Sequence, residues 1–237
     1  MFDERSSVGD AHTTEHSPSY GVLSGATMQA LFVGGSLMAV TIAGMLVVAD
    51  TELADWGMWL YQWPIVGVLV FGALLTAGRY VGLRGVGTDN YLLAVGGATL
   101  SVFAYSWFGG IVLTPFDPGL YQPALALTGA ITIAITLVAA AYVYSTDRSL
   151  KQWATYSGFC FIAGLVAVVI GTFVPPVLIL GFILFLLGFL CDLVYEIWMT
   201  SNEHRSPAAN GLALYIAFAG VFVHVLQLVL RLLANSR

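Results

Sequence analysis

The chain has few charged residues and a single lysine, and both shortages exclude classes of protein. Asp, Glu, Lys and Arg make up only 9% of the 237 residues. The one lysine, Lys151, lies in a polar stretch between two apolar runs. A retinal protein needs a lysine amine inside a membrane span for its Schiff base, so this class is excluded. The net charge of -5 gives no reason to expect a nucleic-acid partner.

Sequence motifs for catalysis are also missing. Neither an HExxH zinc-protease helix nor a GxxxxGK[ST] phosphate-binding loop occurs. The best candidates for an intramembrane serine protease pair are Ser157 and His224, but Ser157 lacks the glycine two positions before it that such a nucleophile loop usually has. We therefore expect no enzyme activity, and no cofactor apart from a transiently bound calcium ion.

Cysteine is scarce, and the start of the chain is not a secretory signal. Cys160 and Cys191 both lie in apolar runs, where a thiol usually behaves as a small hydrophobic group, so we expect neither a disulfide nor a metal site from them. Residues 1–23 are polar and acidic, whereas a secretory signal begins with basic residues. We expect residues 1–23 to form a disordered acidic tail and residues 24–237 to form one membrane domain.

Long apolar runs fill most of the chain. Hydrophobic residues make up 59% of it, and the mean hydropathy is +0.88. Roughly 20 apolar residues cross a bilayer as a helix, and unbroken apolar runs are not the alternating pattern of a membrane barrel. The sequence therefore predicts an all-α integral membrane bundle of seven helices. The predicted spans are residues 24–49, 57–77, 91–114, 120–144, 153–173, 177–198 and 211–233.

Lys and Arg are concentrated on one side of this predicted topology. Cytoplasmic loops carry an excess of these two residues, so the N-terminus is expected to be cytoplasmic. We expect the chain to lie in the plasma or inner membrane, with the lipid bilayer as its partner. The predicted cytoplasmic residues are Arg5, Arg79, Arg84, Arg148, Lys151 and Arg205, and the predicted outer ones are Arg231 and Arg237.

Two acidic residues, Asp192 and Glu196, lie inside the sixth predicted span, and no other span contains one. An ionisable group within a span costs roughly 2.5 to 3.5 kcal/mol and normally faces protein or a water-filled cavity. The two residues are four apart, so their side chains share one face of a helix. We interpret Glu196 as an interfacial acid that reaches water. For Asp192 two roles stay open, a structural ion pair and a site that meets ions.

The neighbouring predicted spans offer few partners for Asp192. At matching depth on the seventh span stands Ala217, which supplies only a methyl group. Arg79 at the end of the second span could reach Asp192 with its long side chain, and Arg84 is its rival. His224 begins a polar stretch of the seventh span, which lines either a polar path or a contact between helices.

The last two spans resemble part of a known family. The segment LGFLCDLVYEIWMTSNEHRSPAANGLALYIAFAG is similar to the C-terminal third of the Bax inhibitor-1 (transmembrane Bax inhibitor motif) family, as a prokaryotic-type member. Asp192 matches the aspartate at the end of that family's sixth span. Residues 214–218 match its LYLDF segment, except that Ala217 replaces the second aspartate. In order and spacing, the likeness covers roughly residues 91–233.

This resemblance implies a bundle with a central sixth helix and a pH-sensitive calcium leak. In the family's pattern two aspartates share a proton and one pairs with an arginine after the second span. Only Asp192 carries over, and Arg79 is placed by position. Because Ala217 cannot share a proton, gating of that kind is in doubt here.

Two functions from different classes follow from these residues. The first is a passive leak channel for calcium or protons, with Asp192 at its cytoplasmic-side constriction and His224 toward the outside. Calcium prefers oxygen ligands, and the carboxylates of Asp192 and Glu196 offer them. The alternative is a non-conducting membrane scaffold or stress regulator. Its predicted contact surface is the small-residue face of Ala213, Ala217 and Gly220.

Overall fold

Seven long apolar helices make up most of the structure, a computed structural model that describes residues 25–202 and 205–235. Within these ranges every element is helical, so the predicted all-α seven-helix membrane bundle is confirmed. The predicted acidic tail, with Arg5, and the terminal Arg237 lie outside the described residues. The seven helices are α1 (Gly25–Ala49), α3 (Pro64–Gly87), α4 (Tyr91–Leu113), α5 (Tyr121–Tyr144), α6 (Gln152–Gly171), α7 (Pro176–Asn202) and α8 (Pro207–Asn235).

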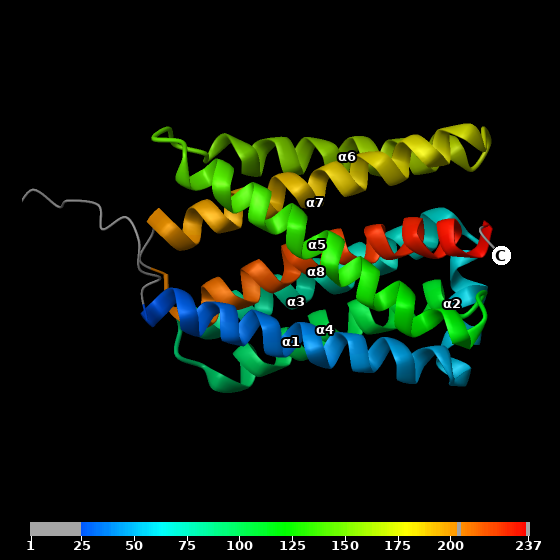
Figure 1. Ribbon diagram of the computed structural model, residues 1–237, viewed down its shortest axis with the longest axis horizontal. Coiled ribbons are helices and arrows are strands. Elements are labelled where there is room, and N and C mark those ends of the chain that lie inside the picture. The colour runs from blue at the N-terminus through cyan, green and yellow to red at the C-terminus, as the bar shows by residue number, and fades with distance from the viewer. Residues whose placement is uncertain (1–24, 203–204, 236–237) are drawn as a thin grey trace, which may run out of the picture.

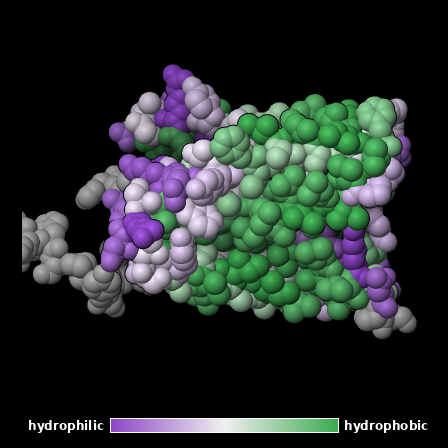
Figure 2. Space-filling model, turned by 90° about the horizontal axis from the view of Figure 1, so that it is seen from above, coloured by the Kyte–Doolittle hydropathy of each residue, from purple (hydrophilic) through white to green (hydrophobic). Residues whose placement is uncertain are grey.

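The surface has the pattern expected of a chain that crosses a membrane several times. A broad hydrophobic band covers the face shown in Figure 2, and polar residues gather at its two ends. Two short elements, α2 (Glu52–Tyr61) and the 3-10 helix η1 (Pro118–Leu120), lie between long helices. Proline stands at the first residue of α3, α7 and α8, where its missing N–H leaves no helical hydrogen bond unmade.

One end of the bundle carries most of the described basic residues, and we call it the basic end. It holds the start of α1 and the loops α3–α4, α5–α6 and α7–α8 (Figure 1). Arg84, Arg148, Lys151 and Arg205 lie in or beside these loops, as the charge pattern predicts. The assignment of this end to the cytoplasm stays a prediction.

The second span differs from its prediction. Residues 57–77 were expected to span and residues 78–90 to form a loop, but α3 begins at Pro64 and continues to Gly87. Glycines suggested the loop, yet Gly78, Gly82 and Gly85 are buried inside the helix. A Cβ atom on Gly97 of α4 would overlap the backbone of Gly82, so these glycines let α3 and α4 approach closely.

The centre of the bundle is the seventh span, α8, and the predicted central sixth span is wrong. In the most apolar stretch of each helix, 78% of the residues of α8 are buried, against 33% for α7. α8 packs on α1, α3, α4, α5 and α7, whereas α7 packs mainly on α6 and α8 (Figure 1). Small residues explain this position, because Ala213, Ala217 and Ala219 allow neighbours on several sides of α8.

The close approach of α3 and α4 leads to a first prediction. Gly97→Ala should lower the free energy of unfolding by about 1–3 kcal/mol, because the added methyl overpacks a backbone contact. Gly96→Ala is the matched control, since a Cβ at Gly96 meets no atom within 4 Å. Thermal unfolding of both variants in detergent measures the difference. Equal stability of the two would show that α3 and α4 do not touch through Gly97.

Candidate functional site

Four charged side chains meet inside the bundle near the basic end, and we call them the acid–arginine cluster. Arg79 of α3 donates from Nη1 to Oδ2 of Asp192 at 2.9 Å and from Nη2 to Oε1 of Glu196. Arg205, just before α8, donates from Nη1 to Oε2 of Glu196 at 3.0 Å. Among the described residues, two carboxylates thus face two guanidinium groups, and their formal charges cancel.

The helices explain how these four groups come together. Asp192 and Glu196 are one turn apart on α7, so both carboxylates project from the same face. Arg79 lies about two turns before the end of α3, within the span, and its planar guanidinium can donate to two acceptors at once. Asp192 is ten residues before the end of α7, or about 15 Å along the helix.

The cluster is enclosed on the side of the acids. Glu196 is 0% exposed and Asp192 is 6% exposed. An unpaired carboxylate at such a site would lose its hydration with no compensation, so the arginines are what allow both acids to stay charged. The side chain of Arg79 is 31% exposed, so the cluster is more open on the side of this arginine.

These contacts decide two expectations for the cluster residues, the arginine partner of Asp192 and the role of Glu196. Arg79 is confirmed as the partner of Asp192, while its rival Arg84 is exposed and donates to the hydroxyl of Tyr80 instead. The interfacial role expected for Glu196 is wrong, because its carboxylate is buried between Arg79 and Arg205. Arg205 was not predicted as a partner of Glu196. Its nearness to Glu196, across one short loop, was the only available signal.

Ala217 does stand at the level of Asp192, as its depth predicts. A Cβ on Gly220 would overlap the ring of Phe189, so these two residues face each other. Because α7 and α8 are antiparallel, three residues after Phe189 on α7 and three residues before Gly220 on α8 bring Asp192 and Ala217 to the same level. Ala217 is 0% exposed. The facing position is therefore present, and it holds a methyl group.

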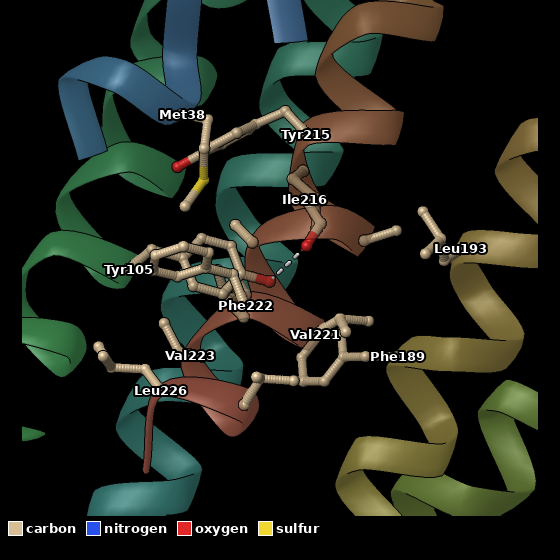
Figure 3. Packing of buried hydrophobic residues seen from close by; sticks show 14 of the residues in the cluster. Met38, Tyr105, Phe189, Leu193, Tyr215, Ile216, Val221, Phe222, Val223 and Leu226 are labelled. Atoms are coloured by element: carbon tan, nitrogen blue, oxygen red, sulfur yellow. Dashed lines mark hydrogen bonds between the residues drawn. The ribbon is translucent and has the colours of Figure 1, made fainter. Parts of the chain in front are cut away.

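The tyrosines around the cluster use their hydroxyls elsewhere. Tyr105 of α4 could have donated to a buried carboxylate, but it donates to the carbonyl oxygen of Ile216 at 2.7 Å (Figure 3). The hydroxyls of Tyr215 and Thr41 lie 2.7 Å apart and bond to each other. These bonds fix α8 against α1 and α4.

A cavity of about 280 Å³ leads from the opposite half of the bundle to the cluster. Arg79 and Asp192 form part of its wall, and Tyr61 of α2 lies at its other end. Most of the remaining wall is aromatic or aliphatic, contributed by α3, α4, α6, α7 and α8. Its further lining residues include Phe71, Gly72, Thr76, Phe108, Phe185 and His224. The cavity thus connects Asp192 with the half of the bundle in which Tyr61 lies.

His224 lies in the wall of this cavity and makes only a local hydrogen bond. Its Nδ1 donates to the carbonyl oxygen of Gly220 at 2.8 Å. Its ring lies 5.1 Å from that of Phe182 and 5.4 Å from that of Phe189, between centroids. Gln227 and Arg231, the polar residues that follow His224 on α8, do not line the cavity. The structure therefore does not bring His224 into contact with the cluster.

The predicted calcium ligands, Asp192 and Glu196, are both occupied by guanidinium groups. Within the described part of the chain, no group of three or more His, Cys, Asp or Glu side chains could hold a metal ion. A calcium ion at these two carboxylates would have to displace Arg79, since both acids bond to it.

No protein-family model, curated protein or solved structure matches this chain.

The acid–arginine cluster leads to a second prediction, on stability. Arg79→Met should lower the free energy of unfolding by about 3–5 kcal/mol, because it leaves two buried carboxylates with one cation between them. Arg84→Met is the control, since Arg84 lies on the same helix but is exposed. Adding Asp192→Asn and Glu196→Gln to Arg79→Met should restore most of the loss. Thermal unfolding measures all four proteins, and equal melting of the two arginine variants would contradict the pairing.

Proposed function

We propose that the protein is a passive cation leak channel of the plasma or inner membrane, with the acid–arginine cluster as its closed constriction. The observation that carries this proposal is the cavity that ends on a buried, ion-paired carboxylate. Buried acids in membrane spans usually serve ion or proton pathways, because their cost is rarely tolerated otherwise. The likeness of residues 91–233 to the Bax inhibitor-1 family supports the same proposal.

The chemistry of the cluster favours cations as the permeant species. When Arg79 swings away, Asp192 and Glu196 present two carboxylates to the cavity, and carboxylate oxygens suit calcium. In the closed arrangement the same two groups are held by Arg79, whose positive charge repels a cation. Conduction therefore requires rupture of the contacts between Arg79 and both acids, and the leak is slow.

The alternative is a non-conducting scaffold, and the contact surface predicted for it is buried inside the bundle. Ala213 and Ala217 are 0% exposed, and Gly220 packs against Phe189 of the same chain. These small residues serve packing within the bundle and cannot meet another protein. No other observation favours the scaffold.

A third prediction tests conduction directly. In liposomes with an internal calcium dye, the parent should admit calcium. Asp192→Asn should reduce the flux by roughly ten-fold, because a loss of about 1.4 kcal/mol in the attraction between the path and the cation corresponds to a factor of ten. The variant removes a carboxylate from the path and also one of the contacts that hold Arg79. Glu196 still holds Arg79, so we expect the lost attraction for the cation to outweigh the easier opening.

Two tryptophan variants distinguish blockage of the cavity from a general disturbance of the fold. Gly72→Trp should block flux, because Gly72 lines the cavity and a Cβ there meets no atom within 4 Å. Gly129→Trp, at an equally open glycine on α5 outside this cavity, should leave flux unchanged. No flux in any protein would favour a scaffold, and equal flux in parent and Asp192→Asn would remove Asp192 from the constriction.

A fourth prediction concerns pH. Ala217→Asp places a third carboxylate opposite Asp192, and three acids near two arginines cannot all stay charged. The variant should bind a proton in the cluster and gain a step in calcium flux between about pH 5 and about pH 8 that the parent lacks. Stopped-flow flux at matched ionic strength measures this step. Parallel pH curves for parent and variant would count against the proposed level of Ala217.

A further inference from the structure

A second hollow, larger than the cavity at the cluster, opens on the side of the bundle between α1 and α5. It measures about 590 Å³, and we call it the α1–α5 groove. α1 and α5 both pack on α8, but they have few contacts with each other, so parts of α7 and α8 form the floor between them. The floor includes Leu193, Ile197, Leu214 and Phe218.

The groove lies in the half of the bundle next to the basic end. On α1 it extends from Thr27 to Ile42, which is about 22 Å of helix. On α5 it extends from Thr136 to Tyr144, the last residue of that helix. A bilayer has about 30 Å of hydrocarbon, so the groove faces acyl chains over more than half of that thickness.

The walls are apolar and are hollowed by small residues. Ala30, Gly34, Gly35 and Ala39 line the groove from α1, and Ala140 lines it from α5. A Cβ on Gly35 meets no atom within 4 Å, so this position borders empty space. The surface within the groove thus has room for a chain of methylene groups.

The mouth of the groove is polar, and two basic residues follow it in the chain after α5. Thr27, Tyr144 and Thr200 line that end. Arg148 and Lys151 follow in the loop after α5, and Nζ of Lys151 lies 5.9 Å from the ring centroid of Trp198 on α7. Positive charge next to an apolar groove is the pattern that holds an anionic lipid headgroup.

We propose that the α1–α5 groove binds one acyl chain of an anionic glycerophospholipid, with its headgroup at Arg148 and Lys151. The groove opens sideways into the bilayer, where acyl chains are the abundant apolar groups. Its volume is in the range of small-molecule sites, about 300–1,000 Å³. The site is independent of the proposed ion path, because the two cavities share no lining residue.

Retained lipid tests this proposal. The full chain is reconstituted in vesicles of equal phosphatidylglycerol and phosphatidylcholine, extracted in detergent, washed, and analysed by native mass spectrometry. We expect one phosphatidylglycerol to stay with each chain. Gly35→Trp fills the groove and should reduce the retained lipid by about ten-fold, the equivalent of 1.4 kcal/mol in affinity. Gly35→Leu serves the same purpose if the tryptophan variant does not fold.

Two controls keep the outcome specific. Gly129→Trp lies on α5 outside the groove, at a glycine whose Cβ also meets no atom within 4 Å, and should retain the lipid. Gly72→Trp fills the other cavity and should retain it too. Loss of lipid in Gly72→Trp but not in Gly35→Trp, or a dimer that only Gly35→Trp disrupts, would overturn the site. Equal retention of phosphatidylcholine would overturn the headgroup assignment.

Discussion

Two negative charges buried in a membrane helix determine much of the architecture around them. Neither Asp192 nor Glu196 can remain charged away from water unless a cation meets it. Arg79 of α3 binds both acids, and Arg205 of the α7–α8 loop binds Glu196. The positive charges of the two guanidinium groups balance the negative charges of the two carboxylates. α3 therefore has to continue past Gly78, and the chain has to turn back sharply after α7. The cluster thus links α3, α7 and the loop before α8 through side-chain contacts.

Close packing of helices is what brings Arg79 to the acids. The glycines on one face of α3 allow α4 to approach it, and α8 with its alanines fits between α4 and α7. In a membrane such small residues replace the hydrophobic drive that holds soluble bundles together. Tyr105 then fixes α4 to α8 through the carbonyl of Ile216 (Figure 3). The close approach of these helices brings Arg79 of α3 within reach of the acids on α7.

Length and hydropathy were sufficient to predict the number and type of the helices, because bilayer thickness fixes both. The pairing of Arg79 with Asp192 was also predictable, since a buried acid needs a cation at similar depth. The burial of Glu196 was not predictable. Glu196 is one turn nearer the helix end than Asp192, and such a position is interfacial if the helix ends soon after it, but α7 continues to Asn202. The glycines in α3 were interpreted as a loop, because glycine has a low helix propensity. That propensity gives no information on their actual role, which is to let α3 lie against Gly97 of α4. The central place of α8 depends on contacts with five helices, which no single stretch of sequence encodes.

Structural and conducting roles of the cluster are compatible on energetic grounds. Removing one partner of a buried ion pair costs about 3–5 kcal/mol, which corresponds to a closed-to-open ratio of roughly 150 to 5,000. A pathway that opens only when Arg79 leaves both acids would then be open for a small fraction of the time. Such a ratio suits a leak, whose purpose is slow equilibration, and not a channel that must pass large currents. In the parent chain Ala217 adds no titrating group opposite Asp192. If the cluster is the proposed constriction, the opening equilibrium would be set by the contacts of Arg79 and Arg205 themselves, and a facing carboxylate would make it respond sharply to protons.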